Sequence, residues 1–240
     1  MGLRERWNRV AADIAGSPAY WTLTATNAGM RRALDPALAA LPPGIALDAG
    51  AGGLAFRQLI AARPGIHYIS CDVALSHPDL DFLADGCALP VRTAAADTVI
   101  CSAVIEHVPD TAALLGELRR ALRPGGRLVL TVPHFHYIHD EPHDYYRFTE
   151  FGIRLVLERA GFCVDTVTPV GGLAAFLSTL ASNAFLGLCA SPGFVRAAAL
   201  AANRAFVAMS AALDRATGGG GKFAIGYVVS ARAGVPEAAS

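Results

Sequence analysis

The chain has 240 residues, of which 53% are hydrophobic and 17% are charged, and its mean hydropathy is +0.40. This composition excludes intrinsic disorder, because such a chain can bury enough apolar surface to offset the entropy lost on folding, and the length allows one domain with an appendage. Lys+Arg and Asp+Glu both number 20. The resulting net charge of zero argues against a nucleic-acid partner, since phosphate binding requires a basic surplus.

The first ten residues, MGLRERWNRV, are charged and lack the apolar stretch of a secretory signal, so we expect a cytoplasmic protein. The five cysteines are an odd number and include no CxxC pair. We interpret them as reduced, buried side chains rather than as disulfides or zinc ligands.

Residues 1–44 place apolar side chains among charged ones at helical spacing, which predicts an N-terminal helical lid that ends at Pro42-Pro43-Gly44. From residue 45 to residue 170, short apolar runs alternate with amphipathic stretches. We expect strands at 45–50, 66–72, 97–103, 126–132 and 162–170, and helices at 54–62, 111–122 and 149–160. Strands that alternate with helices predict an α/β domain whose mostly parallel sheet is covered on both faces.

The segment 171–217 differs from the rest, because no Asp, Glu, Lys or Arg lies between Asp165 and Arg196. We predict an apolar helical hairpin with a break at Ser191-Pro192-Gly193. The tetraglycine 218–221 then leads into KFAIGYVVSAR, which predicts a final strand and a tail within 218–240.

The first helix of this hairpin carries an apolar stripe at Leu173, Phe176, Leu177 and Leu180. One interpretation is a helical cap on the active site or a dimer surface. The other is a hairpin at residues 173–213 that contacts the bilayer peripherally, at the inner face of the membrane. A spanning helix is disfavoured, since the first run is short and the second contains Arg204.

The most informative segment is LDAGAGGLA at 47–55, in which a buried strand runs into a glycine-rich turn before a helix. Glycines let the backbone approach a ligand, and the first turn of a helix offers free N–H groups. Gly50-x-Gly52-x-x-Ala55 matches the dinucleotide fingerprint, whereas Asp48-x-Gly50-x-Gly52 matches the acidic loop of enzymes that bind S-adenosylmethionine (SAM). A tight turn without a ligand is the third alternative.

Asp48 favours the second pattern. A carboxylate at this position repels the pyrophosphate of a nicotinamide dinucleotide, whereas it attracts the sulfonium and ammonium of SAM. Asp72 ends the second expected strand and suits either cofactor, because both have ribose hydroxyls that donate to a carboxylate; a cap at the strand end is the alternative.

Five sequence pieces occur in a specific order: LDAGAGG, the strand-end Asp72, ADGCALP (84–90), DTVICSAVIEHVPD (97–110) and LRPGGRLVLTVP (122–133). With these pieces the chain resembles class I SAM-dependent methyltransferases of type 11 over about residues 45–170. The resemblance implies a Rossmann-like, seven-stranded, mostly parallel sheet with the apolar helical insertion before the last strand.

The resemblance also implies a set of cofactor-binding residues. Asp85 and Gly86 are expected beside the adenine ring with Cys87 adding a backbone contact, and Ser102 and Ala103 on the methionine side. The remaining expected contacts are Asp48, Ala49, Gly50, Gly52 and Asp72. Leu54 departs from the family pattern, which has a third glycine there, and we expect Gly53 to meet that need.

A second group of polar residues follows the fifth expected strand. Four of the seven histidines and three carboxylates fall within residues 134–144. These side chains are ligands for divalent metals, but their spacing matches no compact zinc motif and no HExxH occurs. We therefore predict a substrate loop and no metal site.

The end of this segment, HDYYRFT at 143–149, resembles an ending found in methyltransferases of glycan and lipid-linked biosynthetic clusters. His143 is the first candidate for a catalytic base in contact with the substrate. Tyr146 and Arg147 are expected to bind substrate with His134, the guanidinium by holding an anion. An ion pair of Arg147 with Asp140, Glu141 or Asp144 is the alternative.

His107 is the second candidate base, because an imidazole titrates near neutral pH; capping or packing at the next helix is the alternative. The predicted function is SAM-dependent methyl transfer to a small-molecule acceptor or one linked to lipid or glycan, with oxygen as the expected methylated atom. An NAD(P)-dependent oxidoreductase and a non-catalytic SAM-binding partner of a membrane biosynthetic complex are the alternatives. The sequence does not predict the oligomeric state.

Overall fold

The structure is a computed structural model, and it describes residues 2–14, 17, 19–61, 63–189, 194–217 and 221–234. The chain forms two compact units, which comprise residues 1–35 with 169–226 and residues 36–168 with 227–240. The expected break at Ser191-Pro192-Gly193 lies outside the described residues, as do Gly218, Gly219 and Gly220 of the tetraglycine.

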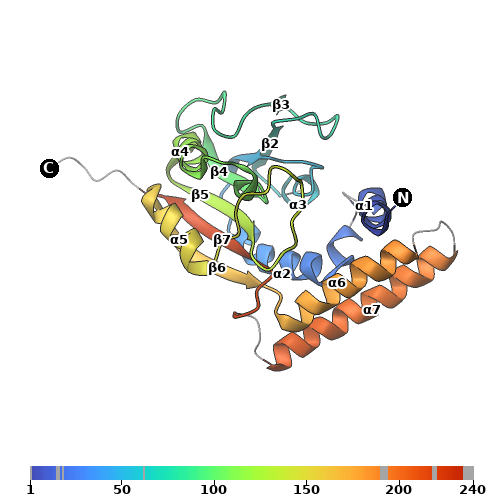
Figure 1. Cartoon of the computed structure of the whole chain (residues 1–240). Helices are drawn as coiled ribbons and strands as arrows, with labels where there is room; N and C mark the ends of the chain where they lie inside the picture. The colour runs from blue at the N-terminus through green and yellow to red at the C-terminus, as the bar shows by residue number, and fades with distance from the viewer. Residues whose placement is uncertain are drawn as a thin grey trace. The chain divides into compact units, whose positions relative to one another are not determined.

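The larger unit is built on a seven-stranded sheet with the strand order β3-β2-β1-β4-β5-β7-β6 (Figure 1). Its strands are β1 (Gly44–Ala49), β2 (Ile66–Asp72), β3 (Phe82–Leu83), β4 (Ala96–Ser102), β5 (Leu122–Pro133), β6 (Phe162–Val170) and β7 (Gly226–Ala233). The predicted Rossmann-like α/β fold is confirmed. The two-residue strand β3 is too short to have a sequence pattern of its own.

Parallel pairing brings several strand ends to one edge of this sheet. β1 pairs in parallel with β2 and with β4, and β4 pairs in parallel with β5. In this register Asp48 lies opposite Ser70 on one side and Ile100 on the other. The strand order reverses between β1 and β4, and open α/β sheets bind ligands at such a point, outside the carboxyl ends of the strands.

Helices cover both faces of this sheet (Figure 1). α4 (Thr111–Ala121) and α5 (Glu150–Arg159) lie on one face, and α3 (Arg57–Ile60) lies on the other. Both longer helices begin at a side-chain cap: Ala113 N donates to Asp110 at 2.9 Å, and Gly152 N donates to Thr149 at 3.0 Å. Their positions agree with the expected helices 111–122 and 149–160.

α3 is much shorter than the expected helix at 54–62. Residues 52–56 form turns instead, and Leu54 has a left-handed backbone with φ 58°. The missing third glycine is therefore replaced by a strained leucine, and Gly53 does not supply the left-handed residue as expected. The glycine-rich loop thus takes the place of the first three residues of the expected helix, a little less than one turn.

The smaller unit consists of helices, namely α1 (Leu3–Ile14), the first part of α2 (Ala25–Ala39), α6 (Leu173–Leu188) and α7 (Phe194–Thr217). Val10, Leu23, Leu186 and Ala199 form one buried apolar cluster in it. Asp214 of α7 accepts hydrogen bonds from Ala174 N and Ala175 N at 2.9 Å each, so it caps the start of α6. The helices expected at both ends of the chain are present, whereas a role as lid stays a prediction.

α6 has small and polar residues on its buried side and large apolar residues on its exposed side. Its buried residues include Ala175, Ser178, Thr179 and Ser182. Of the predicted apolar stripe, Leu173, Leu177 and Leu180 are 43%, 57% and 44% exposed. Small side chains let neighbouring helices approach closely, and Thr179 forms a hydrogen bond of 2.9 Å with Thr26 of α2.

Among the helices that the structure describes, none combines the length and the apolarity that a membrane crossing requires.

The exposed leucines of α6 generate a test of the predicted bilayer contact. We expect the chain to co-sediment with lipid vesicles. A triple variant, Leu173→Ser with Leu177→Ser and Leu180→Ser, should reduce the partition of the chain into vesicles roughly tenfold or more, because burial of apolar side chains drives such binding. A matched control replaces Phe151 and Leu155, two exposed apolar residues of α5, by serine. If the unaltered chain does not bind vesicles, or if both variants lose binding equally, bilayer contact through α6 is excluded.

Candidate active site

The glycine-rich loop after β1 is held against β2 by its backbone. Gly50 N and Ala51 N both donate to the carbonyl of Cys71 at 2.9 Å. Gly50 has φ 81°, and a Cβ at this position would lie 2.2 Å from Val104 Cγ2, so only glycine fits there. Gly52 has φ 49°, but a Cβ there would meet no atom within 4 Å. The loop therefore leaves open space beside Gly52.

Asp48 lies beneath this loop and is 0% exposed. Tyr68 of β2 donates its hydroxyl hydrogen to Asp48 Oδ2 at 2.5 Å, whereas Oδ1 has no hydrogen-bond partner within the described part of the chain. Burial raises the pKa of Asp48 to about 7, against the opposing effect of the Tyr68 bond. A nearby cation would stabilise this carboxylate, because it lacks a compensating charge. The partner Tyr68 was not predicted from the sequence.

Asp72 ends β2 and connects the strand to the loop. Gly52 N donates to Asp72 Oδ2 at 2.7 Å, and Ala74 N donates to Oδ1 at 3.3 Å. The predicted residues Asp48, Gly50, Gly52 and Asp72 thus lie together, with Ala49 opposite Cys71 in the sheet.

The other residues expected at the cofactor follow β3 and β4. The exposed Asp85 accepts a hydrogen bond from Cys87 N at 2.8 Å, and Gly86 lies between them. Ser102 forms a hydrogen bond with Thr131 of β5 at 2.8 Å. Ala103 N donates to the Thr131 carbonyl and hydroxyl, both at 3.1 Å. Thr131 thus fixes the end of β4, although nothing in the sequence marked it.

The segment after β4 brings a second buried carboxylate to the same edge of the sheet. Glu106 lies in a short 3-10 turn (Ile105–His107), and its side chain is 0% exposed. Neither carboxylate oxygen has a hydrogen-bond partner among the described residues. Burial raises the pKa of Glu106 to about 7, although the charges of His107 and Arg147 oppose the shift.

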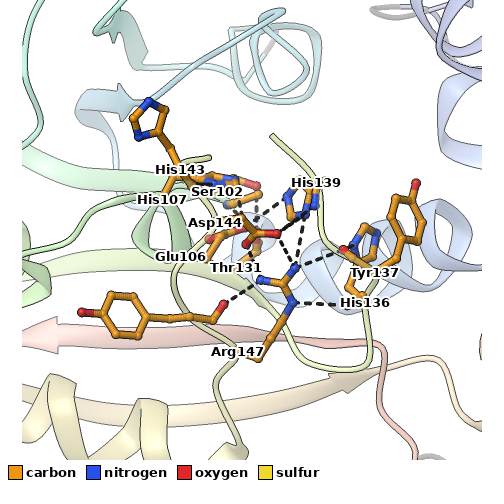
Figure 2. Close-up of polar contacts among 12 residues, drawn as sticks. Ser102, Glu106, His107, Thr131, His136, Tyr137, His139, His143, Asp144 and Arg147 are labelled. Carbon is orange, nitrogen blue, oxygen red and sulfur yellow. Dashed lines mark hydrogen bonds and ion pairs between the residues drawn. The ribbon is translucent and has the colours of Figure 1, made fainter. Parts of the chain in front are cut away.

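Arg147 holds the histidine-rich loop together (Figure 2). Its guanidinium pairs with both oxygens of Asp144, and it also donates to the carbonyls of His136, Tyr137 and Tyr146 at 3.3, 3.0 and 2.8 Å. This pairing lowers the pKa of Asp144. Of the two alternatives for Arg147, the structure shows the ion pair. The N–H groups of Arg147 donate to Asp144 and to backbone carbonyls of the loop.

The remaining candidates lie along the same loop. His107 Nδ1 donates a hydrogen bond to the carbonyl of His143 at 2.5 Å. The ring of His143 is exposed, and its Nδ1 lies 3.0 Å from the Tyr145 hydroxyl. Tyr146 donates its hydroxyl hydrogen to the Pro109 carbonyl at 2.9 Å. The ring of His134 lies 5.6 Å from that of Tyr227 on β7, and burial lowers the pKa of His134.

Comparison with known proteins finds a match for the segment that carries the glycine-rich loop and Glu106. Residues 47–130 match the family described as methyltransferase domain. This segment is thus similar to methyltransferase domains. A demethylmenaquinone methyltransferase of Streptomyces griseus is 35% identical over 143 residues, which are 53% of this chain and 62% of that protein. The chain thus matches less than two thirds of the length of this relative.

Solved structures with the same fold have little sequence identity to the methyltransferase domain. The cyclase SpnF covers 87% of this chain and 81% of its own, with a TM-score of 0.60 and 16% identity. Phosphoethanolamine N-methyltransferase 2 of Haemonchus contortus, solved with SAM, covers 98% of this chain and 60% of its own, with a TM-score of 0.54 and 16% identity. These likenesses concern the fold, which by itself does not determine the reaction.

The residues around the loop fit SAM by their charge. A cationic ligand would compensate Asp48, whose Oδ1 lacks a partner, and the open space beside Gly52 admits a ligand close to the backbone. An anionic pyrophosphate at the same place would face a buried carboxylate, which is unfavourable. The structure therefore favours SAM over a nicotinamide dinucleotide on electrostatic grounds.

Replacing Asp48 by Asn is expected to have opposite effects on stability and on binding. Because the pKa of Asp48 is about 7 in the folded chain against 3.8 ordinarily, the stability from its protonated form is present below pH about 4 and is lost as the pH rises to about 7. Asp48→Asn should therefore raise the melting temperature at pH about 8 and change it little at pH about 4, while it weakens SAM binding roughly tenfold or more at the higher pH.

Thermal unfolding and calorimetry measure these two effects. The matched control is Asp79→Asn, which alters an exposed carboxylate paired with Arg57, and it should change neither quantity appreciably. Undiminished SAM affinity in Asp48→Asn would contradict the electrostatic role of Asp48.

Proposed function

We propose that the chain is a SAM-dependent methyltransferase that methylates a hydroxyl oxygen of a small-molecule acceptor or one linked to lipid or glycan. The observation that carries this proposal is Asp48, a fully buried carboxylate with one unpartnered oxygen beneath a glycine-rich loop. Asp48 lies where the strand order reverses between β1 and β4, the point at which open α/β sheets bind ligands. The cation that methyl transfer requires is the cofactor SAM.

The glycine-rich loop and the strand ends beside it each have a role in binding SAM. The carboxylate of Asp48 compensates positive charge, and Asp72 is a ribose acceptor. Gly50 allows the turn to pack against Val104, and the backbone at Gly52 allows close approach of the cofactor. Asp85, Gly86 and Cys87 border the adenine side, and Ser102 and Ala103 border the methionine side. When bound, SAM supplies an electrophilic methyl group, so the chain itself must align the acceptor, exclude water and accept one proton.

His143 is the base that we propose for this proton. Its imidazole is exposed, and the Tyr145 hydroxyl at 3.0 Å from Nδ1 orients the ring. The carbonyl of His143 accepts the Nδ1 proton of His107, so the backbone of the loop is fixed at this residue as well. A positioned imidazole is the commonest general base.

The acceptor class follows from the side chains that the loop exposes. Phe135, Tyr137 and Tyr145 are 41%, 41% and 44% exposed, and the hydroxyls and imidazoles around them provide polar partners. Aromatic faces with interspersed polar groups bind sugars and other rings. This composition supports a ring-bearing acceptor with a free hydroxyl, while Arg147 acts in positioning the loop through Asp144.

Carbon methylation of a quinone-type ring is the second candidate. It is favoured by the Streptomyces griseus relative, whose name describes methylation of demethylmenaquinone, and by the aromatic side chains of the same loop. The two candidates differ in the bond formed and can be separated by its chemistry, because an aryl or alkyl methyl ether is cleaved by hydriodic acid and a C–methyl bond is not.

The test is transfer of an isotopically labelled methyl group from SAM to extracted lipids, glycans, small metabolites and demethylmenaquinone, followed by mass spectrometry. We expect a labelled product whose methyl group is released by hydriodic acid. His143→Ala should reduce turnover on the order of 100-fold and leave SAM affinity unchanged, because general-base catalysis contributes about that factor or more. His67→Ala, at an exposed histidine of β2, is the control.

Label that resists hydriodic acid would assign carbon methylation instead. SAM binding without transfer to any acceptor would favour a non-catalytic partner and overturn the proposal, and binding of a nicotinamide nucleotide in place of SAM would favour the oxidoreductase. If His143→Ala retains full turnover, His143 is not the base.

A further inference from the structure

A three-residue cluster beside the proposed acceptor loop has the composition of a metal site. It consists of Glu106 and His107, which follow β4, and His139 from the loop after β5. One ligand atom from each residue lies within 4.8 Å of the others. The sequence did not indicate this set, because the expectation of no metal considered spacings within residues 134–144, and only His139 comes from there.

Glu106 is the part of the cluster that requires a partner. Its side chain is completely buried, and both of its oxygens lack hydrogen-bond partners among the described residues. Burying a carboxylate without a hydrogen-bond partner is unfavourable unless a cation approaches it. The two imidazoles lie near this carboxylate, with His107 Nε2 and His139 Nε2 at 3.8 and 4.0 Å from Glu106 Oε1.

Both imidazoles are oriented by contacts at their other nitrogen. The His143 carbonyl can only accept a hydrogen bond, so the Nδ1 of His107, 2.5 Å away, must carry a proton. In the neutral imidazole the lone pair is then on Nε2, the nitrogen that faces Glu106. His139 Nδ1 lies 3.5 Å from both Asp144 Oδ2 and Arg147 Nη2, and its Nε2 is on the side of Glu106. The tautomer that donates from Nδ1 to Asp144 is the one that leaves Nε2 free to bind a metal. Metal-bound histidines typically have such a carbonyl or carboxylate at the second nitrogen.

Arg147 stabilises this arrangement from outside (Figure 2). It pairs with the same Asp144 that contacts His139, and His139 N also donates to Asp144 Oδ2 at 2.8 Å. Figure 2 shows Asp144 between the guanidinium and the imidazole of His139. The loop is thereby fixed with one imidazole facing the buried carboxylate.

We propose that Glu106 Oε1, His107 Nε2 and His139 Nε2 bind a divalent transition-metal ion of the Zn²⁺ class. Two imidazole nitrogens and one carboxylate oxygen are a donor set that such ions prefer, and three protein ligands leave a coordination position open for another molecule. The site lies between the segment after β4 and the loop after β5, both in the larger unit, and it involves none of the residues proposed to hold SAM.

The distances permit the site with small side-chain movements. Bonds of about 2.1 Å place the ligand atoms of a tetrahedral ion about 3.4 Å apart. The two histidine–glutamate separations of 3.8 and 4.0 Å must therefore shorten by about half an ångström, and the separation of the two imidazole nitrogens, which is within 4.8 Å, by up to about 1.4 Å. The rings of His107 and His139 lie edge to face with centroids 4.8 Å apart, an arrangement that allows both Nε2 atoms to converge on one point.

Zinc titration of the metal-free full chain, followed by calorimetry and by a chromophoric chelator in competition, tests the proposal. We expect one Zn²⁺ per chain, and expect Glu106→Gln and His139→Gln each to weaken the affinity tenfold or more. Co²⁺ in the same site should give visible absorption bands that Glu106→Gln abolishes. Neither measurement uses SAM or an acceptor, so its outcome is independent of the proposed methyl transfer.

Two matched controls distinguish this site from surface binding. Glu141→Gln alters an exposed carboxylate of the same loop, and His67→Ala removes an exposed imidazole of β2; both should retain the affinity of the unaltered chain. Glu106→Gln keeps the shape of the side chain and removes a buried charge, so it should fold. The proposal is wrong if the unaltered chain shows no saturable Zn²⁺ site, or if both Glu106→Gln and His139→Gln bind Zn²⁺ as tightly as it does.

Discussion

Two buried carboxylates, each with an oxygen that accepts no hydrogen bond from a described residue, are the constraint on which this site depends. Asp48 at the end of β1 and Glu106 just after β4 are both 0% exposed, and each has an oxygen without a hydrogen-bond partner in the described residues. Parallel pairing of β1 with β4 brings them to the same edge of the sheet. Because burial of an unpaired charge is costly, the edge is suited to cations supplied from outside the chain, a sulfonium at one carboxylate and a metal ion at the other.

The loop that follows β5 is held by the backbone of Glu106 and by Arg147. Tyr145 N and Tyr146 N donate to the carbonyl of Glu106 at 2.8 and 3.3 Å, and Arg147 fixes the remainder through Asp144. The exposed aromatic side chains and His143 are therefore held on a rigid framework rather than on a free loop. Such positioning is what an in-line methyl transfer requires of a protein, since the cofactor provides the reactive group.

The sequence predicted the sheet because buried strands are apolar runs bounded by turns, and it predicted the loop edge because Asp48 and the glycines have a specific order. It could not predict which oxygen of Asp48 lacks a partner, since Tyr68 comes from a neighbouring strand. The exposed leucines of α6 show the same limit: helical spacing places Leu173, Leu177 and Leu180 on one side, but small residues occupy the buried side. The convergence of Glu106 and His139 depends on a turn and a loop that carry no periodic signal.

The central claim is that the space beside Gly52 belongs to a cationic sulfur cofactor, and calorimetric titration of SAM into the unaltered chain and into Gly52→Ala tests it most directly. The added methyl group meets no atom within 4 Å, so the variant should fold with a backbone strain of about 1 kcal/mol at φ 49°. The account predicts that the unaltered chain binds SAM and not a nicotinamide dinucleotide, and that Gly52→Ala loses SAM affinity tenfold or more. Equal SAM affinity in both proteins, or preference for the dinucleotide, would contradict it.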